Sequence, residues 1–75
     1  MNLDQAPLSA VLRVARVRVT AGREAQARQL EEIGFLPGEP VCVMSRGLWG
    51  GDPVAVRVGL STFALRRDEA ACIEL

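Results

Sequence analysis

The chain has 75 residues, enough for one domain with a thin, single hydrophobic core. Nine basic residues balance nine acidic ones and 49% of the chain is hydrophobic, which is the composition of an ordered globular domain. The zero net charge argues against binding to nucleic acid, and the absence of histidine removes the commonest general base and metal ligand, so we expect no enzyme.

The N-terminal third predicts one strand. Residues 1–6 carry no periodic pattern, and residues 8–12, which follow a proline, have the composition of a short helical turn. From Val14 to Val19, arginines alternate with alanine and valine. Alternation of this kind predicts a half-buried strand over residues 14–19.

A helix is predicted over residues 23–33. Ala27, Leu30 and Ile33 recur every three residues, which places them on one helical face. Gly34 follows the last apolar position, where a left-handed C-terminal cap favours glycine.

The middle of the chain predicts a hairpin. Pro37-Gly38 suits the two central positions of a type II turn. Val41 to Arg46 is a predicted strand whose first four residues are apolar on both faces, which is typical of a central strand. Residues 47–52 form the predicted connection, and Val54 to Val58 alternates as a strand with one buried face.

The C-terminal segment predicts two more short strands. Phe63 to Arg66 is the first, and Cys72 to Leu75 closes the chain as the second. Asp68 is positioned to cap a single helical turn between them. Five short strands with one helix inserted after the first predict a mainly β, SH3-like barrel that occupies residues 1–75 as a single domain.

No constellation of residues predicts catalysis or a dedicated metal site. Glu31 and Glu32 point to different sides of the predicted helix, and no serine has a histidine partner. Cys42 and Cys72 lie 30 positions apart, which makes no disulfide framework, and the simplest interpretation is that both are small buried hydrophobes. Weak binding of a divalent ion by surface carboxylates, and weak self-association, stay open as alternatives.

Leu48 and Trp49 are the candidate contact site for a partner. They form an apolar pair at a predicted hairpin tip, flanked by glycines, where a turn normally carries polar residues. Protein interfaces favour tryptophan, so one interpretation is an exposed anchor. The other is that the tip folds back and Trp49 covers the end of its own barrel.

The N-terminus predicts a cytoplasmic protein. Met1 to Gln5 has neither the positive region nor the apolar region of a signal peptide. No apolar run approaches the roughly 20 residues that span a bilayer, so we expect no membrane insertion.

Three segments in the right order resemble the FeoA family of proteins. Residues 30–43 read Leu30-x-x-Ile33-Gly34-Phe35-Leu36-Pro37-Gly38-x-x-Val41-x-Val43, which is similar to the core motif of that family. Gly51-Asp52-Pro53-Val54-x-Val56 looks like the start of its third strand, and residues 63–73 resemble its closing segment. The resemblance runs from about residue 8 to residue 75.

The resemblance implies a small cytosolic SH3-like protein of bacterial ferrous iron uptake. Such a protein would act by protein–protein interaction with the cytoplasmic part of a FeoB-type membrane transporter. It implies no catalytic residue and no cofactor. The alternative is a metal-responsive regulatory domain, which would bind a divalent transition metal and change its association state.

Overall fold

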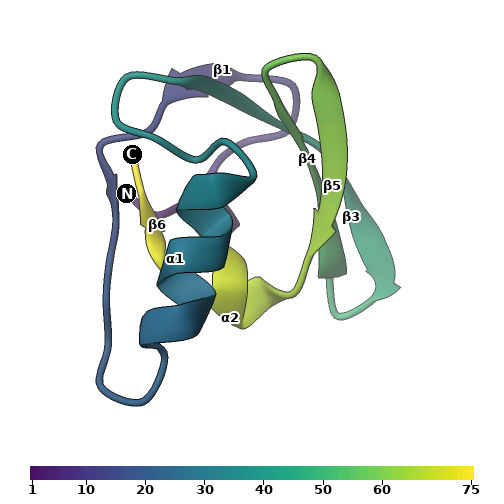
Figure 1. Cartoon of the computed structure of the whole chain (residues 1–75). Helices are drawn as coiled ribbons and strands as arrows, with labels where there is room; N and C mark the ends of the chain where they lie inside the picture. The colour runs from purple at the N-terminus through teal and green to yellow at the C-terminus, as the bar shows by residue number, and fades with distance from the viewer.

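The computed structural model describes all of residues 1–75, as six strands, two α-helices and one short 3₁₀ helix (Figure 1). In chain order the elements are η1 (Leu3–Gln5), β1 (Val11–Arg13), β2 (Arg16–Val17), α1 (Glu24–Glu32), β3 (Pro40–Trp49), β4 (Asp52–Val58), β5 (Ser61–Leu65), α2 (Arg67–Ala70) and β6 (Ile73–Glu74). The mainly β class expected from the sequence is confirmed.

The strands form two antiparallel sheets. The larger has the order β1-β3-β4-β5, and the smaller pairs β2 with β6. In Figure 1, α1, α2 and β6 lie to the left of the long strands β3, β4 and β5, and the two termini lie side by side. The backbone N–H of Leu75 donates to the carbonyl of Met1 at 2.9 Å, which joins the two ends of the chain.

A single hydrophobic core connects these layers. The helix α1, both sheets and the N-terminal segment all contribute to it, and no polar or charged residue is buried. Fifteen buried residues make up the cluster: Leu3, Ala6, Val14, Val17, Ala27, Leu30, Phe35, Val41, Val43, Val54, Val56, Val58, Leu65, Ala70 and Ile73. Burial of this apolar surface is the main favourable contribution to folding.

The β3–β4 pairing places the alternating valines inward, as predicted. Val43 lies opposite Val56, and both are fully buried, whereas Arg57 lies on the outer face opposite Cys42. β3 is central because it has a strand on each side. Its outer face is only partly covered, since Cys42 is half-buried and Met44 is exposed.

Only Arg16–Val17 of the strand predicted over residues 14–19 form a strand, β2, and the helical turn predicted over residues 8–12 is absent, because β1 occupies Val11–Arg13. Val14 is hydrogen-bonded to the loop before β3: its N–H donates to the carbonyl of Glu39, and its carbonyl accepts from the N–H of Gly38. The N–H of Ala15 bonds the carbonyl of Glu74 instead, at 2.7 Å. The chain therefore passes from one sheet to the other at this point, which creates β1 before it and β2 after it.

The additional strand β1 also changes the expected barrel. There are six strands rather than five, the helix follows the second of them, and the two sheets do not close into a continuous barrel. Helix α1 itself lies where the sequence predicts it, with Ala27 and Leu30 buried and Gly34 at a positive φ of 127° just beyond its end.

The second helix begins differently from the prediction. Its N-cap is Arg66, not Asp68, and the side chain of Glu69 accepts a hydrogen bond from the Arg66 N–H at 2.8 Å. The N–H of Arg67 is bonded by the carboxylate of Asp52 from the start of β4, at 3.0 Å. A residue distant in sequence therefore satisfies one of the free donors at this helix end.

Candidate functional site

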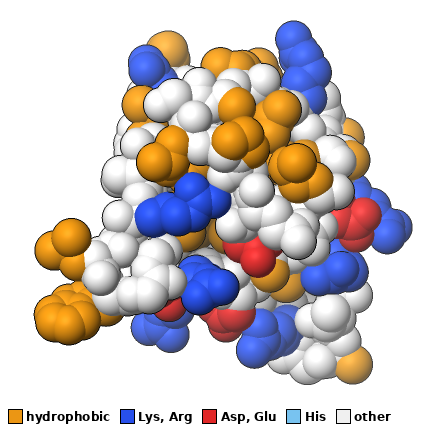
Figure 2. Space-filling view, turned by 180° about the vertical axis from the view of Figure 1, so that it is seen from behind, with side chains coloured by type: hydrophobic (Ala, Val, Ile, Leu, Met, Phe, Trp, Pro, Cys, Tyr) orange, Lys and Arg blue, Asp and Glu red, His pale blue; other side chains and the backbone are white.

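The β3–β4 hairpin tip carries the two most prominent neighbouring apolar side chains on the surface. Leu48 is 96% exposed and Trp49 is 86% exposed. Figure 2 shows hydrophobic side chains projecting at the lower left, where this hairpin tip lies in that view. The interpretation that Trp49 covers the end of its own barrel is therefore wrong.

The connection at the tip is shorter than predicted. β3 continues through Leu48 to Trp49, which pairs with Asp52, so the loop consists of Gly50 and Gly51 alone. Their φ angles are 64° and 79°, the left-handed values that a two-residue type I′ turn requires at both central positions. The two glycines therefore hold Trp49 at the extreme end of a tight hairpin.

Gly47 sets the path of the strand into the tip. The β3–β4 register shifts between Arg46 and Trp49, which marks an irregularity in the ladder. A Cβ atom at Gly47 would clash with the carbonyl group of Asp52 on the opposite strand. Only glycine permits this close approach of the two backbones, and the residues that follow it, Leu48 and Trp49, both face solvent.

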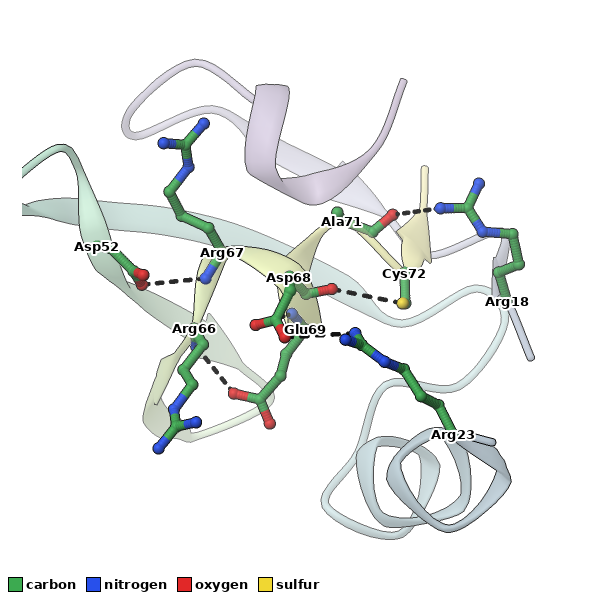
Figure 3. Close-up of polar contacts among 9 residues, drawn as sticks. All are labelled: Arg18, Arg23, Asp52, Arg66, Arg67, Asp68, Glu69, Ala71 and Cys72. Atoms are coloured by element: carbon green, nitrogen blue, oxygen red, sulfur yellow. Dashed lines mark hydrogen bonds and ion pairs between the residues drawn. The ribbon is translucent and has the colours of Figure 1, made fainter. Parts of the chain in front are cut away.

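Two hydrogen bonds to α2 fix the orientation of the tip. Arg67 donates from its guanidinium to the carbonyl of Gly50 at 3.1 Å and from its backbone N–H to Asp52 Oδ1 at 3.0 Å. Figure 3 shows the Asp52 carboxylate directed at the start of α2. These bonds connect the turn to α2 and so set the direction in which the apolar pair projects.

Arg46 fixes the base of the same hairpin. Its guanidinium donates to the carbonyls of Asp4 and Ala6, at 3.1 and 2.6 Å, and so ties the N-terminal segment to β3. The ion pairs of the molecule are Arg16–Glu74 and Arg23–Asp68, so the guanidinium groups of Arg46 and Arg67 are not paired with a carboxylate. The unpaired charge at the tip is therefore that of Arg67, whose guanidinium bonds the turn at Gly50, whereas that of Arg46 lies at the base.

The carboxylates and cysteines considered in the sequence analysis do not come together into one site. Glu31 and Glu32 are both exposed on α1. Cys42 and Cys72 are free thiols, and only Cys72 is buried, with its sulfur 3.4 Å from the carbonyl of Asp68. No three potential metal ligands of the histidine, cysteine and carboxylate types cluster, and the surface contains no pocket.

The sequence predicts the tip at Leu48 and Trp49, but it does not predict that Asp52 and Arg67 hold this tip. Asp52 and Arg67 are separated by 15 positions, and nothing in their spacing indicates a contact. The one available signal was the Gly-Gly-Asp sequence, which is compatible with a two-residue turn closed by the aspartate.

Comparison with known proteins gives the same family over the whole chain. A family model described as the FeoA domain matches residues 1–75. No curated protein sequence matches significantly. No helix reaches the length and apolar character needed to cross a bilayer.

Several solved structures have the same fold. The FeoA of Stenotrophomonas maltophilia in complex with zinc is 39% identical, with a TM-score of 0.89 over 99% of this chain and 87% of that one. It is described as a prokaryotic SH3 domain protein and a candidate ferrous iron transport activating factor, so the SH3-like expectation is confirmed. The iron(II) transport protein A of Clostridium thermocellum is 28% identical, with a TM-score of 0.83 over 99% of this chain and 43% of that one. The FeoA of Chlorobium tepidum is 27% identical, with a TM-score of 0.81 over 99% of this chain and 67% of that one.

Proposed function

The chain belongs to the FeoA family, which is associated with ferrous iron transport, and we propose on this premise that it is a cytoplasmic accessory protein of iron uptake. Its action is binding rather than catalysis. The partner is the cytoplasmic part of a FeoB-type ferrous iron transporter, and the contact surface is the apolar tip formed by Leu48 and Trp49.

The observation that carries this proposal is the exposure of an apolar pair on a hairpin that hydrogen bonds connect to α2. A tip that serves only as a turn would be expected to carry polar residues. Burial of a tryptophan side chain in a partner can contribute a few kcal/mol, enough to anchor a transient complex. The unpaired charge of Arg67, whose guanidinium bonds the turn at Gly50, favours a partner whose apolar pocket is bordered by a carboxylate.

A metal-responsive role is the second candidate, because the Stenotrophomonas relative was solved with zinc. In this chain the donors for such a site would be surface carboxylates or the half-buried Cys42 thiol. Since no three ligands cluster within one molecule, an ion would have to recruit donors from a second molecule or from solvent.

Affinity capture from the native membrane fraction tests the proposal. We expect the immobilised chain to retain the transporter and the Trp49→Ala variant to retain much less of it. The matched control is Leu60→Ala, because Leu60 is 98% exposed at the tip of the next hairpin and should not contribute. Equal retention by all three chains would contradict the assignment of the tip.

A further inference from the structure

The larger sheet ends at β5, and the outer edge of this strand has no neighbour. β5 pairs with β4 along its whole length, from Ser61 opposite Val58 to Leu65 opposite Val54. Beyond that pairing, no backbone or side-chain hydrogen bond in the molecule involves residues 61–65. The edge therefore presents its outward backbone groups to solvent.

The turn before β5 determines which groups these are. Gly59 and Leu60 form a two-residue hairpin turn, with Gly59 at a φ of 59°. Such a turn closes on a hydrogen-bonded pair, here Val58 and Ser61, and bonded and non-bonded pairs then alternate along the ladder. Phe63 is consequently bonded to β4, while Thr62 and Ala64 direct their N–H and C=O groups outward.

β5 also lacks the features that protect an edge strand. Natural edges are shortened, charged or interrupted by proline or a bulge. β1, the opposite edge, has three residues and includes Arg13, whose guanidinium bonds the carbonyl of Gly38 at 2.8 Å. β5 has five residues with neither charge nor proline, and its register with β4 is unbroken.

We propose that β5 pairs antiparallel with β5 of a second copy of this chain, about a two-fold axis that passes beside Phe63. In this register the two Phe63 residues form a non-hydrogen-bonded pair on the axis. Thr62 of each copy faces Ala64 of the other, and each such pair exchanges two N–H to C=O bonds. All four outward groups of each strand are then satisfied, and the two sheets join into one.

The side chains along β5 favour a second copy over an unrelated peptide. Phe63 is partly buried and packs against the core, so its remaining surface would be covered by the same residue of the other copy. The flanking pairs join threonine to alanine and serine to leucine, so no charges are opposed. The net charge of zero removes long-range repulsion between copies.

Sedimentation equilibrium over a wide concentration range is the first test. We expect a monomer–dimer equilibrium for the unmodified chain. Ala64→Pro removes an outward N–H without breaking a bond to β4, and should raise the dimer dissociation constant by about tenfold or more, because two symmetry-related bonds are lost together. Ala64→Ser is the matched control, since it keeps the N–H and should dimerise normally.

Amide hydrogen exchange of the unmodified chain tests the register without a variant. The Thr62 and Ala64 amides should be protected at high protein concentration and exchange freely on dilution, while the Phe63 amide stays protected throughout. A mixed-label sample should show a contact between the Phe63 Hα atoms of the two copies. A chain that stays monomeric, a dimer that leaves these two amides exchanging freely, or protection that appears only with an added peptide of another protein would each overturn the proposal.

Discussion

At the scale of single residues, the backbone rather than side-chain packing places Trp49 in solvent. Its position follows from the bulge at Gly47 and the two-glycine turn, and its side chain is 86% exposed. Trp49→Ala should therefore leave the melting temperature within a few degrees of the original. A buried tryptophan would cost about 3–5 kcal/mol on the same truncation, so a large drop in a circular dichroism melt would contradict the exposed position.

Val56 and Arg57 test the register of β4. Val56 is fully buried between Val43 and Phe63, whereas Arg57 is exposed on the outer face. Val56→Asp places an unpaired charge in the core, which costs several kcal/mol, comparable to the roughly 5 kcal/mol that stabilises a domain of this size. We expect this variant to be unfolded and Arg57→Ser to melt almost normally. The reverse order in thermal melts would show that the register is wrong.

Gly47 and Gly50 should differ in their tolerance of alanine. Gly50 has open space around its Cβ position, so Gly50→Ala should lose only about 1–2 kcal/mol from its left-handed backbone. Gly47→Ala drives a methyl group into the Asp52 carbonyl and should destabilise the domain more. Urea unfolding of both variants gives the comparison, and an equal or smaller effect at Gly47 would contradict the close approach of the strands.

At the scale of elements, Asp52 couples the β3–β4 hairpin to α2. Asp52→Ala removes the bond to the Arg67 N–H and should cost about 1 kcal/mol, the usual value for a lost helix cap. In a domain of this size that corresponds to about 4–8 °C in melting temperature. Asp52→Asn keeps an acceptor oxygen and should retain most of the stability. If both variants melt like the unmodified chain, the carboxylate does not hold the helix.

The elements that the sequence predicted well are those whose signal is local. The three-residue spacing of Ala27, Leu30 and Ile33 defines α1, and the alternation of Val54, Val56 and Val58 defines the buried face of β4. Each pattern reflects one face against the core and needs no knowledge of the partner element.

Elements defined by distant partners could not be predicted. The alternation over residues 14–19 runs unbroken through the point where the chain changes sheets, because that change depends on Glu39 and Glu74 rather than on neighbours. The candidate site likewise has one part that the local sequence predicts and one part that it does not. Its apolar pair and glycines are visible locally, whereas its anchoring by Arg67 depends on a contact 17 positions away from Gly50.

At the scale of the whole molecule, the binding and metal-responsive functions differ in their response to ions. A ligand that binds the folded state raises the melting temperature by mass action. On the proposed function, excess Fe²⁺ or Zn²⁺ should leave the melting temperature and the mass unchanged at a fixed protein concentration. A saturable rise in either quantity, reduced in Cys42→Ser or in a carboxylate variant, would favour the metal-responsive function instead.

The molecule presents two separate surfaces, the apolar tip at Trp49 and the open edge at β5. One is proposed to bind the transporter and the other a second copy. They carry no residue in common, so a variant of either surface should leave the structure of the other unchanged. A dimer would then present two tips, and linked sites can raise the overall affinity for a partner with more than one binding position.

Trp49 is the only tryptophan, and this permits the most direct test of the proposed transporter contact. A chain labelled with 5-fluorotryptophan carries one fluorine signal, which reports on the surroundings of this side chain alone. Titration with the cytoplasmic part of a FeoB-type transporter should shift or broaden that signal and reduce its sensitivity to replacement of H₂O by D₂O. Binding that is evident from sedimentation while the fluorine signal and its solvent sensitivity stay unchanged would contradict the account.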